Sequence, residues 1–455
     1  MPITTFAPQP ARPGVRGPAT TNRLADGGLR IAESFLAQIA AMLARDSGRI
    51  CARWQHAEAA GDLTLSSHFQ PILSLAHSRT VGYEALMRAH TLAGEQINPL
   101  DVFARATDFV SALQLDRLSR TVHFENFIQS PDQLGWLFLN THPRVFVEGM
   151  RHGDSLADWF LQYGLPPSQV VLEVLEQAVT DEVLLREAVA FYRDLGCMIA
   201  IDDFGAGHSN FNRVWSLRPE IVKLDRCIVA LAATDQSLRR TMPVLVSLLH
   251  EAGSMVLIEG IETEDEAMMA MDADADFVQG YYFARPSERL PADDCFADMF
   301  DHLWAGFRQT VDRDALAYRE QILPYMNALG HCASLVQSGI SFDAACQPFL
   351  NLEYVQRCYL LDRDGRQTGP NLPGPHAIQD RTGRFAPVAD AQGANWSRRF
   401  YFRRALEHPG RVQVTRPYLS ITTARPCVTV SSAVLVNGET HVLCGDIAWS
   451  ERSTR

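Results

Sequence analysis

Eight short apolar runs, separated by segments with helical spacing, constrain the fold of this chain more than any other feature of its sequence. The runs are rich in β-branched and aromatic residues, as strands are. Alternation of strand and helix over this length predicts a (β/α)8 barrel, a fold of about 250 residues. An open doubly wound sheet is the alternative, and it is disfavoured because no glycine-rich phosphate fingerprint follows any run. The runs are 68–75, 82–87, 136–140, 170–175, 197–203, 221–225, 255–261 and 277–283.

The residues before the runs predict two further segments. Residues 1–28 are rich in Pro and Arg and lack the apolar core of a secretory signal, which predicts a disordered leader. Apolar residues recur at helical spacing from Ile31 to Leu43, which predicts an amphipathic helix within 29–60. The barrel domain is then expected over 61–293.

The residues after the barrel predict a connector and a second domain. Helical spacing predicts a connector over 294–346, interrupted at Pro324. Strand-like runs within 347–455, with Asp-Gly at 364–365 and Asn-Gly at 437–438 as turn signals, predict a small antiparallel sheet flanked by helices. The second domain is therefore expected to be α+β.

Composition excludes several classes of protein. A net charge of -12 without a basic run argues against a long nucleic acid as ligand, because such binding depends on many Lys and Arg contacts to phosphates. The apolar stretches fall short of the roughly 20 residues that span a bilayer. Nine cysteines without a C-x-x-C pair disfavour a disulfide framework or a structural zinc site, and most are expected to be buried. We therefore expect a cytoplasmic protein without a membrane span.

Lys223 is the only lysine in the sequence; every other strong cation is arginine. An ammonium is a compact charge whose pKa the surroundings can lower, whereas a guanidinium is a permanent cation. Either the position requires an amine, or the lysine survives by chance in an arginine-rich chain. The residue alone does not decide between these.

Polar residues lie near the ends of the predicted strands, where barrel enzymes hold their active sites. Any one acid there could simply begin the next helix, whose dipole favours negative charge. Several carboxylates converging on one rim, however, would repel one another unless cations offset them. Oxygen donors without Cys or His indicate Mg²⁺ or Mn²⁺, and a shared Asp would let two ions lie about 4 Å apart. The residues are Glu84, Asn140, Glu173, Asp202, Asp203, Lys223, Glu259 and Gln279.

Seven motifs, in this order, resemble those of EAL-domain cyclic di-GMP phosphodiesterases. The resemblance covers about 66–286 and implies an EAL-type barrel that hydrolyses cyclic di-GMP to linear pGpG with two divalent ions. The motifs are Glu84-Ala85-Leu86-Met87-Arg88, Phe138-Leu139-Asn140, Glu173-Val174-Leu175-Glu176, Asp202-Asp203-Phe204-Gly205-Ala206-Gly207, Val222-Lys223-Leu224-Asp225, Glu259-Gly260-Ile261-Glu262 and Gln279-Gly280.

The resemblance implies a role for each matched residue. It assigns Lys223 to holding or deprotonating the attacking water, and Glu259 and Gln279 to completing the metal and water shell. Glu176 corresponds to an anchor for the loop after Asp203. The implied metal ligands are Glu84, Asn140, Glu173, Asp202, Asp203, Glu259 and Gln279, and the implied substrate contacts are Gln70, Leu86, Arg88, Asp225, Gln279 and Gly280.

Glu262 admits a second interpretation, and Leu175 and His208 depart from the family pattern. Glu262 corresponds to a supporting catalytic carboxylate, but it precedes a capping-box pattern and could serve only helix entry. Leu175 stands where the family commonly has Thr. His208 stands where Tyr or a similar residue is common, and an exposed loop histidine is favoured there over a proton carrier.

The C-terminal region resembles the PAS-like or Cache-like domain attached to some EAL proteins, chiefly through 358–366 and 401–406. This implies a sensory or dimerising module, with a homodimer and an unidentified ligand as partners; a purely structural domain is the alternative. For the barrel, the alternatives are a cyclic di-GMP receptor without turnover, and a lyase or racemase with Lys223 as base.

Overall fold

The computed structural model of the protein consists of two compact units, with the boundary between Arg308 and Gln309. The predicted leader lies outside the residues that the structure describes, as do Glu176 and His208. The described residues are 39, 41–46, 48–54, 62–130, 135–149, 156–175, 179, 181–207, 211–291, 293–377, 391–421 and 425–449.

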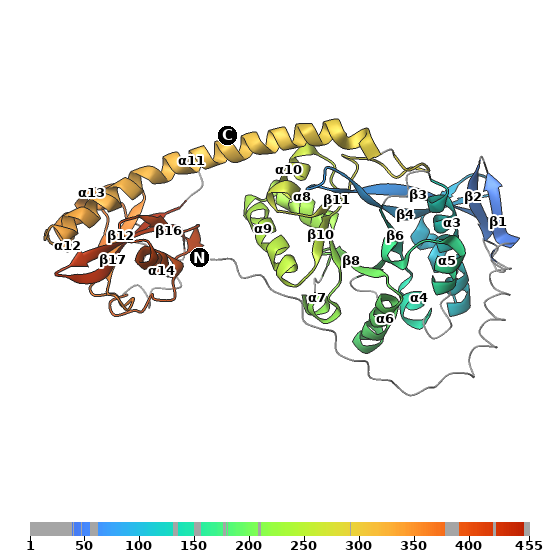
Figure 1. The fold of residues 1–455 in the computed structure, drawn as a ribbon, viewed down its shortest axis with the longest axis horizontal. Helices are drawn as coiled ribbons and strands as arrows, with labels where there is room; N and C mark the ends of the chain where they lie inside the picture. The colour runs from blue at the N-terminus through green and yellow to red at the C-terminus, as the bar shows by residue number, and fades with distance from the viewer. Residues whose placement is uncertain are drawn as a thin grey trace, which may run out of the picture. The chain divides into compact units, whose positions relative to one another are not determined.

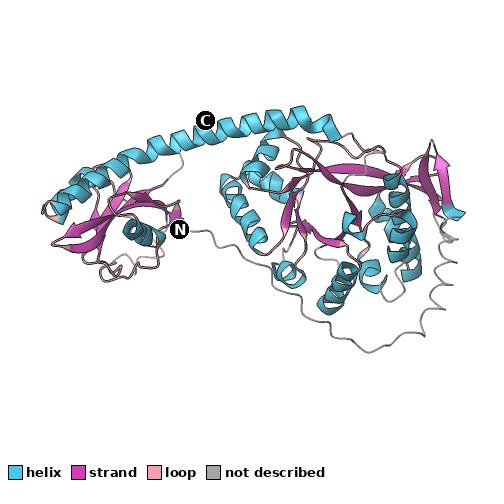
Figure 2. Ribbon diagram, viewed as in Figure 1, coloured by secondary structure: helices cyan, strands magenta, loops and turns pink. Residues whose placement is uncertain are grey.

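In the first unit, eight described strands close into a barrel (Figures 1 and 2). Each predicted run forms one of them, so the predicted barrel is confirmed and the open sheet is excluded. The order around the barrel is β3-β11-β10-β9-β8-β7-β6-β4, and β4 pairs again with β3. The strands are β3 (Leu63–Ser74), β4 (Arg79–Thr91), β6 (Trp136–Asn140), β7 (Val170–Leu175), β8 (Met198–Phe204), β9 (Ile221–Leu224), β10 (Met255–Ile258) and β11 (Phe277–Val278).

Strand β3 departs from an all-parallel barrel, because it runs antiparallel to both β4 and β11. A short turn joins β3 to β4, and Ser78 has a positive φ of 52° in it. Ser74 Oγ lies 2.9 Å from His77 Nδ1 across the same turn. A turn this short reverses the chain, whereas a parallel connection needs a crossover of a dozen or more residues.

Helices cover the outside of the barrel, and several begin at a side chain that accepts backbone N–H groups. Asp181, for example, accepts from Val183 N and Leu184 N and so satisfies two donors of α6. The helices and the short strand β5 (Gln96–Ile97) are α2 (Pro99–Arg105), α3 (Phe109–Ile128), α4 (Pro143–Glu148), α5 (Leu156–Tyr163), α6 (Glu182–Asp194), α7 (Phe211–Leu217), α8 (Arg226–Thr234), α9 (Gln236–Glu251) and α10 (Glu264–Asp272).

Apolar side chains fill the inside of the barrel. Phe138, Val171, Ala200 and Leu257 form one buried cluster there, and they come from four different strands of the barrel. A larger buried cluster packs the strands against the helices. This packing fixes the strand ends that carry the polar residues.

The predicted helix within 29–60 is wrong over its second half. Leu43–Asp46 (β1) and Arg49–Trp54 (β2) form an antiparallel hairpin, and β2 extends the sheet at β3. Gly48 (φ 83°) permits the tight turn between them. Trp54 is buried against residues of β3, β4 and α3. The segment around Leu43 therefore pairs as a strand, although the spacing of its apolar residues fits a helix.

The predicted connector is a 41-residue helix, α11 (Ala297–Gln337), and it runs through Pro324 without the predicted interruption. Phe300 and Leu303 at its start are fully buried in the core of the first unit. Leu329 and Cys332 near its end are buried in the core of the second unit. The helix is therefore part of both units and not a separate segment.

The second unit holds an antiparallel sheet in the order β13-β12-β17-β16-β14, with β15 also paired to β16. Asn437 and Gly438 have positive φ values of 51° and 85° and join β16 to β17, which confirms the predicted hairpin. The elements are α12 (Phe342–Ala345), α13 (Gln347–Leu350), β12 (Val355–Leu361), β13 (Leu372–Pro373), α14 (Phe400–Glu407), β14 (Gln413–Val414), β15 (Tyr418–Leu419), β16 (Pro426–Val436) and β17 (Glu439–Ala448). The likeness to PAS or Cache domains stays a prediction.

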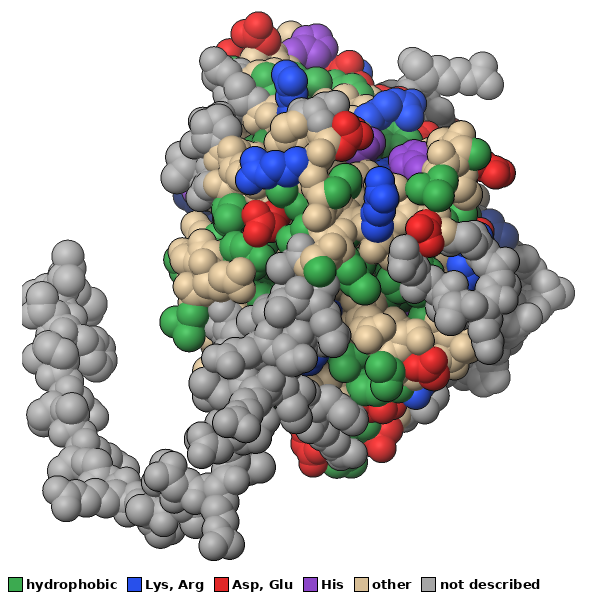
Figure 3. All heavy atoms as spheres, turned by 90° about the vertical axis from the view of Figure 1, so that its right-hand side faces the viewer, with side chains coloured by type: hydrophobic (Ala, Val, Ile, Leu, Met, Phe, Trp, Pro, Cys, Tyr) green, Lys and Arg blue, Asp and Glu red, His purple; other side chains and the backbone are tan. Residues whose placement is uncertain are grey.

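Two predictions from composition bear on the described residues. No helix among them has both the length and the hydropathy of a membrane span. Seven of the nine cysteines are buried, as predicted. On the face of the first unit shown in Figure 3, acidic, basic and hydrophobic side chains are interspersed.

Candidate active site

Lys223 lies at the centre of a ring of carboxylates at the ends of the barrel strands. Its Nζ is 2.6 Å from Glu173 Oε1, 2.6 Å from Glu259 Oε1 and 3.0 Å from Asp202 Oδ1. Glu84 Oε1 is farther away, at 3.9 Å. The structure therefore brings together the lysine and four of the acids predicted from the strand ends.

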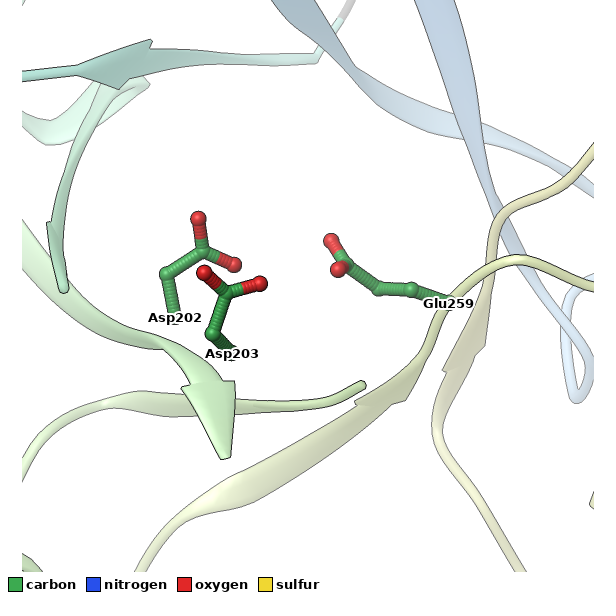
Figure 4. Close-up of side chains that lie close together, drawn as sticks. All are labelled: Asp202, Asp203 and Glu259. Carbon is green, nitrogen blue, oxygen red and sulfur yellow. The ribbon is translucent and has the colours of Figure 1, made fainter. Parts of the chain in front are cut away.

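Strand β8 supplies two neighbouring aspartates because its end is irregular. Its register with β9 shifts between Ile201 and Phe204, and Asp203 has a positive φ of 56°. This backbone turn lets both side chains face the same side, which a regular strand does not allow. Oxygens of Asp202, Asp203 and Glu259 lie within 4.8 Å of one another (Figure 4).

A chain of amides borders the acidic centre. Asn140 Nδ2 donates to Glu84 Oε1 at 2.7 Å, and Gln279 Nε2 donates to Glu84 Oε2 at 2.7 Å. Gln279 Nε2 also lies 3.1 Å from Gln70 Oε1, and Gln70 Nε2 donates to the Ala284 carbonyl. Both oxygens of Glu84 are thereby oriented by predicted site residues.

Burial and mutual repulsion perturb the acids of this centre. Burial raises the pKa of Glu173 well above its ordinary value, against the attraction of Lys223. Burial likewise raises the pKa of Glu259 to about 8. The pKa of Asp203 rises to about 6 through burial and the charge of Asp202. A centre with this much clustered negative charge favours added cations.

The pKa of Lys223 is shifted upward in this centre. Burial alone would lower the pKa of its ammonium, but the surrounding carboxylates, Asp202 foremost, outweigh burial and raise the pKa well above its ordinary value. The metal-free protein therefore keeps Lys223 protonated, as a donor of hydrogen bonds.

The donors present fit hard divalent ions. Glu173 Oε2 and Gln279 Oε1 are buried, and neither has a hydrogen-bond partner among the described residues. Buried polar oxygens are nearly always satisfied, so such atoms indicate a missing partner. Carboxylate and amide oxygens are the ligands that Mg²⁺ and Mn²⁺ take in proteins.

Two hollows flank the acidic centre, and Glu84 lines both. The larger, of about 560 Å³, is also lined by Leu86, Arg88 and Asn140. The smaller, of about 210 Å³, is lined by Gln70, Glu259, Glu262, Gln279 and Gly280. The two hollows therefore share one carboxylate of the acidic centre.

Two predicted substrate contacts have clear structural roles. Asp225 caps α8 by accepting from Cys227 N at 2.8 Å. Gly280 has no room for a side chain, because a Cβ there would lie 2.0 Å from the Ile261 carbonyl oxygen. Asp225 therefore has a structural role that needs no substrate. At position 280 a glycine is required because another backbone segment approaches too closely for a side chain.

The two interpretations of Glu262 are partly resolved. The capping box is present, but Thr263 and Glu266 form it. The Glu262 carboxylate instead pairs with Arg226 Nη1 at 3.0 Å beside the smaller hollow. Arg226 was not predicted, although it directly follows the matched motif that ends at Asp225.

Reasoning from strand ends also missed residues that helices bring to the larger hollow. Phe103 of α2 and His142, which directly precedes α4, stack with ring centroids 5.4 Å apart and 25° between planes. His123 of α3 is buried there and lies 2.6 Å from Ser67 Oγ, and burial lowers its pKa to about 3. No sequence signal marks these positions, because helical spacing alone does not show which helix faces a pocket.

Residues 52–286 match the sequence model of the EAL domain. The chain belongs to the EAL-domain family. The match covers just over half of the chain and includes every residue of the acidic centre.

The chain is similar in sequence to several known proteins. The EAL-domain containing protein YkuI of Bacillus subtilis is 25% identical over 348 residues, which cover 74% of this chain and 82% of YkuI. The probable cyclic di-GMP phosphodiesterase PdeD of Escherichia coli is 27% identical, over 48% of this chain and 40% of PdeD. The cyclic di-GMP phosphodiesterase RocR of Pseudomonas aeruginosa is 30% identical, over 33% of this chain and 38% of RocR.

The crystal structure of YkuI shares the fold beyond the EAL domain. It superposes with a TM-score of 0.69 at 21% identity, and it covers 85% of this chain and 96% of YkuI. The similarity to YkuI therefore includes the second unit.

Proposed function

We propose that the EAL domain hydrolyses one phosphodiester bond of cyclic di-GMP to give linear pGpG, with two Mg²⁺ or Mn²⁺ ions at the acidic centre. The observation that carries the proposal is Lys223 enclosed by Glu173, Asp202 and Glu259 at the strand ends. The names of PdeD and RocR support the reaction class. The YkuI structure, solved with cyclic di-GMP and calcium, supports this ligand.

The residues of the centre divide into ion ligands and a hydrogen-bond donor. Glu84, Asn140, Glu173, Asp202, Asp203, Glu259 and Gln279 would hold the ions. When bound, divalent ions lower the pKa of a water and offset charge on phosphate oxygens. The Lys223 ammonium has three N–H donors and would orient the attacking water oxygen. The water oxygen forms the new bond to phosphorus while the bond from phosphorus to one bridging sugar oxygen breaks. The attacking water loses a proton to solvent, and the leaving sugar oxygen takes one up from solvent to become a hydroxyl.

The two hollows suit the two halves of the substrate. The stacked rings of Phe103 and His142 line the larger hollow and offer an aromatic surface for one guanine. Arg88 lines the same hollow and would pair with a phosphate. Tyr281 and Arg226 line the smaller hollow, where the other half would lie.

The deciding experiment incubates the purified full chain with cyclic di-GMP and Mg²⁺ or Mn²⁺ and separates the nucleotides by chromatography. We expect pGpG to form, and to disappear with chelator or in Asp202→Asn. Asp272→Asn, an exposed acid at the end of α10, is the matched control and should retain activity. Binding without turnover would overturn hydrolysis in favour of a receptor. Turnover of small carboxylic acids alone would favour a lyase or racemase.

A further inference from the structure

A groove of about 560 Å³ in the second unit is lined by three arginines, Arg399, Arg404 and Arg416. None of the described residues that line it is acidic. Among the described residues, none of the three guanidinium groups forms an ion pair or a hydrogen bond. Three cations that no described acidic residue pairs with repel one another, so an anion would lower the energy of the groove.

Aromatic rings hold two of these arginines in place. The guanidinium carbon of Arg399 lies 5.5 Å from the centroid of Tyr418 and 6.0 Å from that of Trp396. The guanidinium carbon of Arg404 lies 5.1 Å from the centroid of Phe400. Stacked guanidinium groups keep their N–H donors available, and their restricted motion reduces the entropy lost on binding a ligand.

A buried hydrogen-bond network holds Tyr418, which is one of the residues that line the groove. Asp446 is 4% exposed; its Oδ2 accepts from Arg357 Nε at 2.7 Å, and its Oδ1 accepts from Thr429 Oγ1 at 2.7 Å. The Tyr418 hydroxyl lies 2.7 Å from Thr429 Oγ1 and donates to it, since the Thr429 proton is already given to Asp446. The Tyr418 proton is thus used inside the unit, and the arginines remain as donors for a ligand.

We propose that this groove, which we call the arginine groove, binds a small polyanion that carries two or more carboxylate or phosphate groups. Its volume is typical of a small-molecule site. Arginine forks bind carboxylates and phosphates through paired N–H donors. A singly charged ligand would leave most of the groove's charge uncompensated, which favours a multivalent one.

The test is calorimetric titration of the metal-free full chain with citrate and, separately, with pyrophosphate. We expect saturable binding of at least one probe, with the tighter one identifying the carboxylate or the phosphate class. Arg399→Gln and Arg416→Gln should each weaken binding about tenfold or more, because each removes charge-assisted hydrogen bonds. Arg403→Gln, an exposed arginine of α14 that does not line the groove, is the control and should bind as the parent does.

Melting temperatures of the variants serve to check their folding. Arg416 is exposed, so its substitution leaves the core intact even where Arg399→Gln does not. The proposal would be overturned if neither probe bound the parent. It would equally be overturned if Arg416→Gln bound the probes as tightly as Arg403→Gln.

Discussion

Lys223 and Glu173 form an ion pair in the interior of the EAL domain, with Nζ and Oε1 2.6 Å apart and both side chains only 1% exposed. Two further carboxylate oxygens, of Asp202 and Glu259, lie within 3.0 Å of the same ammonium. The ammonium of Lys223 therefore pairs with three carboxylates at once. A buried charge left without its partner is costly, so the lysine and the acids depend on one another.

We predict that Lys223→Arg lowers kcat at least 100-fold while the protein stays folded with metal. A guanidinium keeps the charge, but it is larger and planar and does not reproduce three donors about one nitrogen. Steady-state hydrolysis of cyclic di-GMP, with melting temperature as the folding control, checks this. A variant with most of the parental kcat would show that no amine is required at this position.

Lys223→Met separates the structural role of the charge from the chemical one. We expect the metal-free protein to lose about 3–5 kcal/mol of stability, because the buried carboxylates lose their cation. Added Mg²⁺ should restore much of that loss, since ions would replace the missing charge. Denaturant unfolding with and without metal measures both values, and equal losses in the two conditions would contradict this account.

Asp202→Ala and Asp203→Ala should each abolish hydrolysis and leave the fold. Each removes an oxygen donor from the group of three formed by Asp202, Asp203 and Glu259, and neither removes a packed apolar side chain. Calcium should inhibit the parent, because its longer bonds and looser coordination misplace the ions. Turnover assays with each metal and calorimetric metal titration check these outcomes, and full activity of either variant with chelator present would contradict them.

Affinity for Mg²⁺ should rise with pH up to about 8. Glu259, with a pKa of about 8, and Asp203, with a pKa of about 6, must lose their protons before they bind an ion. If one proton is released, the apparent Kd falls about tenfold per pH unit below pH 8. Calorimetric titration between pH 6 and 9 measures this, and Glu259→Gln should flatten the upper part of the profile.

Stability of the metal-free protein should change in the opposite sense. The folded-state pKa of Glu259 lies above the unfolded value of about 4.3, so the folded state binds its proton more tightly. The free energy of unfolding therefore falls as pH rises from about 4.3 to about 8. Melting temperatures with chelator should decline over this window, and a larger decline in Glu259→Gln than in the parent would refute the assignment.

A chain truncated at Arg308 should keep a folded EAL domain, so that its activity can be measured without the second unit. A chain truncated at Ser287 should be less stable. A chain that ends at Ser287 loses Phe300 and Leu303 from the core of the EAL domain, which costs roughly 5 kcal/mol at 1.5–3 kcal/mol for each buried side chain. A chain that ends at Arg308 should stay folded. We expect it to differ from the full chain in rate or in subunit state, because we propose a homodimer and a regulatory role for the second unit.

Light scattering and kinetics of the full chain and of the chain that ends at Arg308 check this. Equal kinetics and equal mass, with and without citrate or pyrophosphate, would leave the second unit without a regulatory role. Equal melting temperatures for the Ser287 and Arg308 truncations would contradict the assignment of α11 to the core.

Strand positions were predictable because a buried strand is marked locally, by apolar side chains and the polar residue that ends it. The hairpin at 43–54 was not predictable in this way. Spacing around Leu43 fits a helix, but β2 gains hydrogen bonds from β3 and burial against β4 and α3, which lie much farther along the sequence. Pro324 likewise does not end α11, although a proline removes one hydrogen bond of the helix.

The sequence by itself determined which residues stand at the strand ends, and hence that Lys223 and the acids meet on one rim. The positions of these residues follow from the apolar pattern of each strand and from the order of the strands along the chain, and both can be read locally from the sequence. Only the tertiary structure decided that the lysine is held charged, that Phe103 and His142 line the larger hollow, and that three arginines share a groove in the second unit. These depend on burial and on distances between elements remote in sequence, which no local pattern specifies.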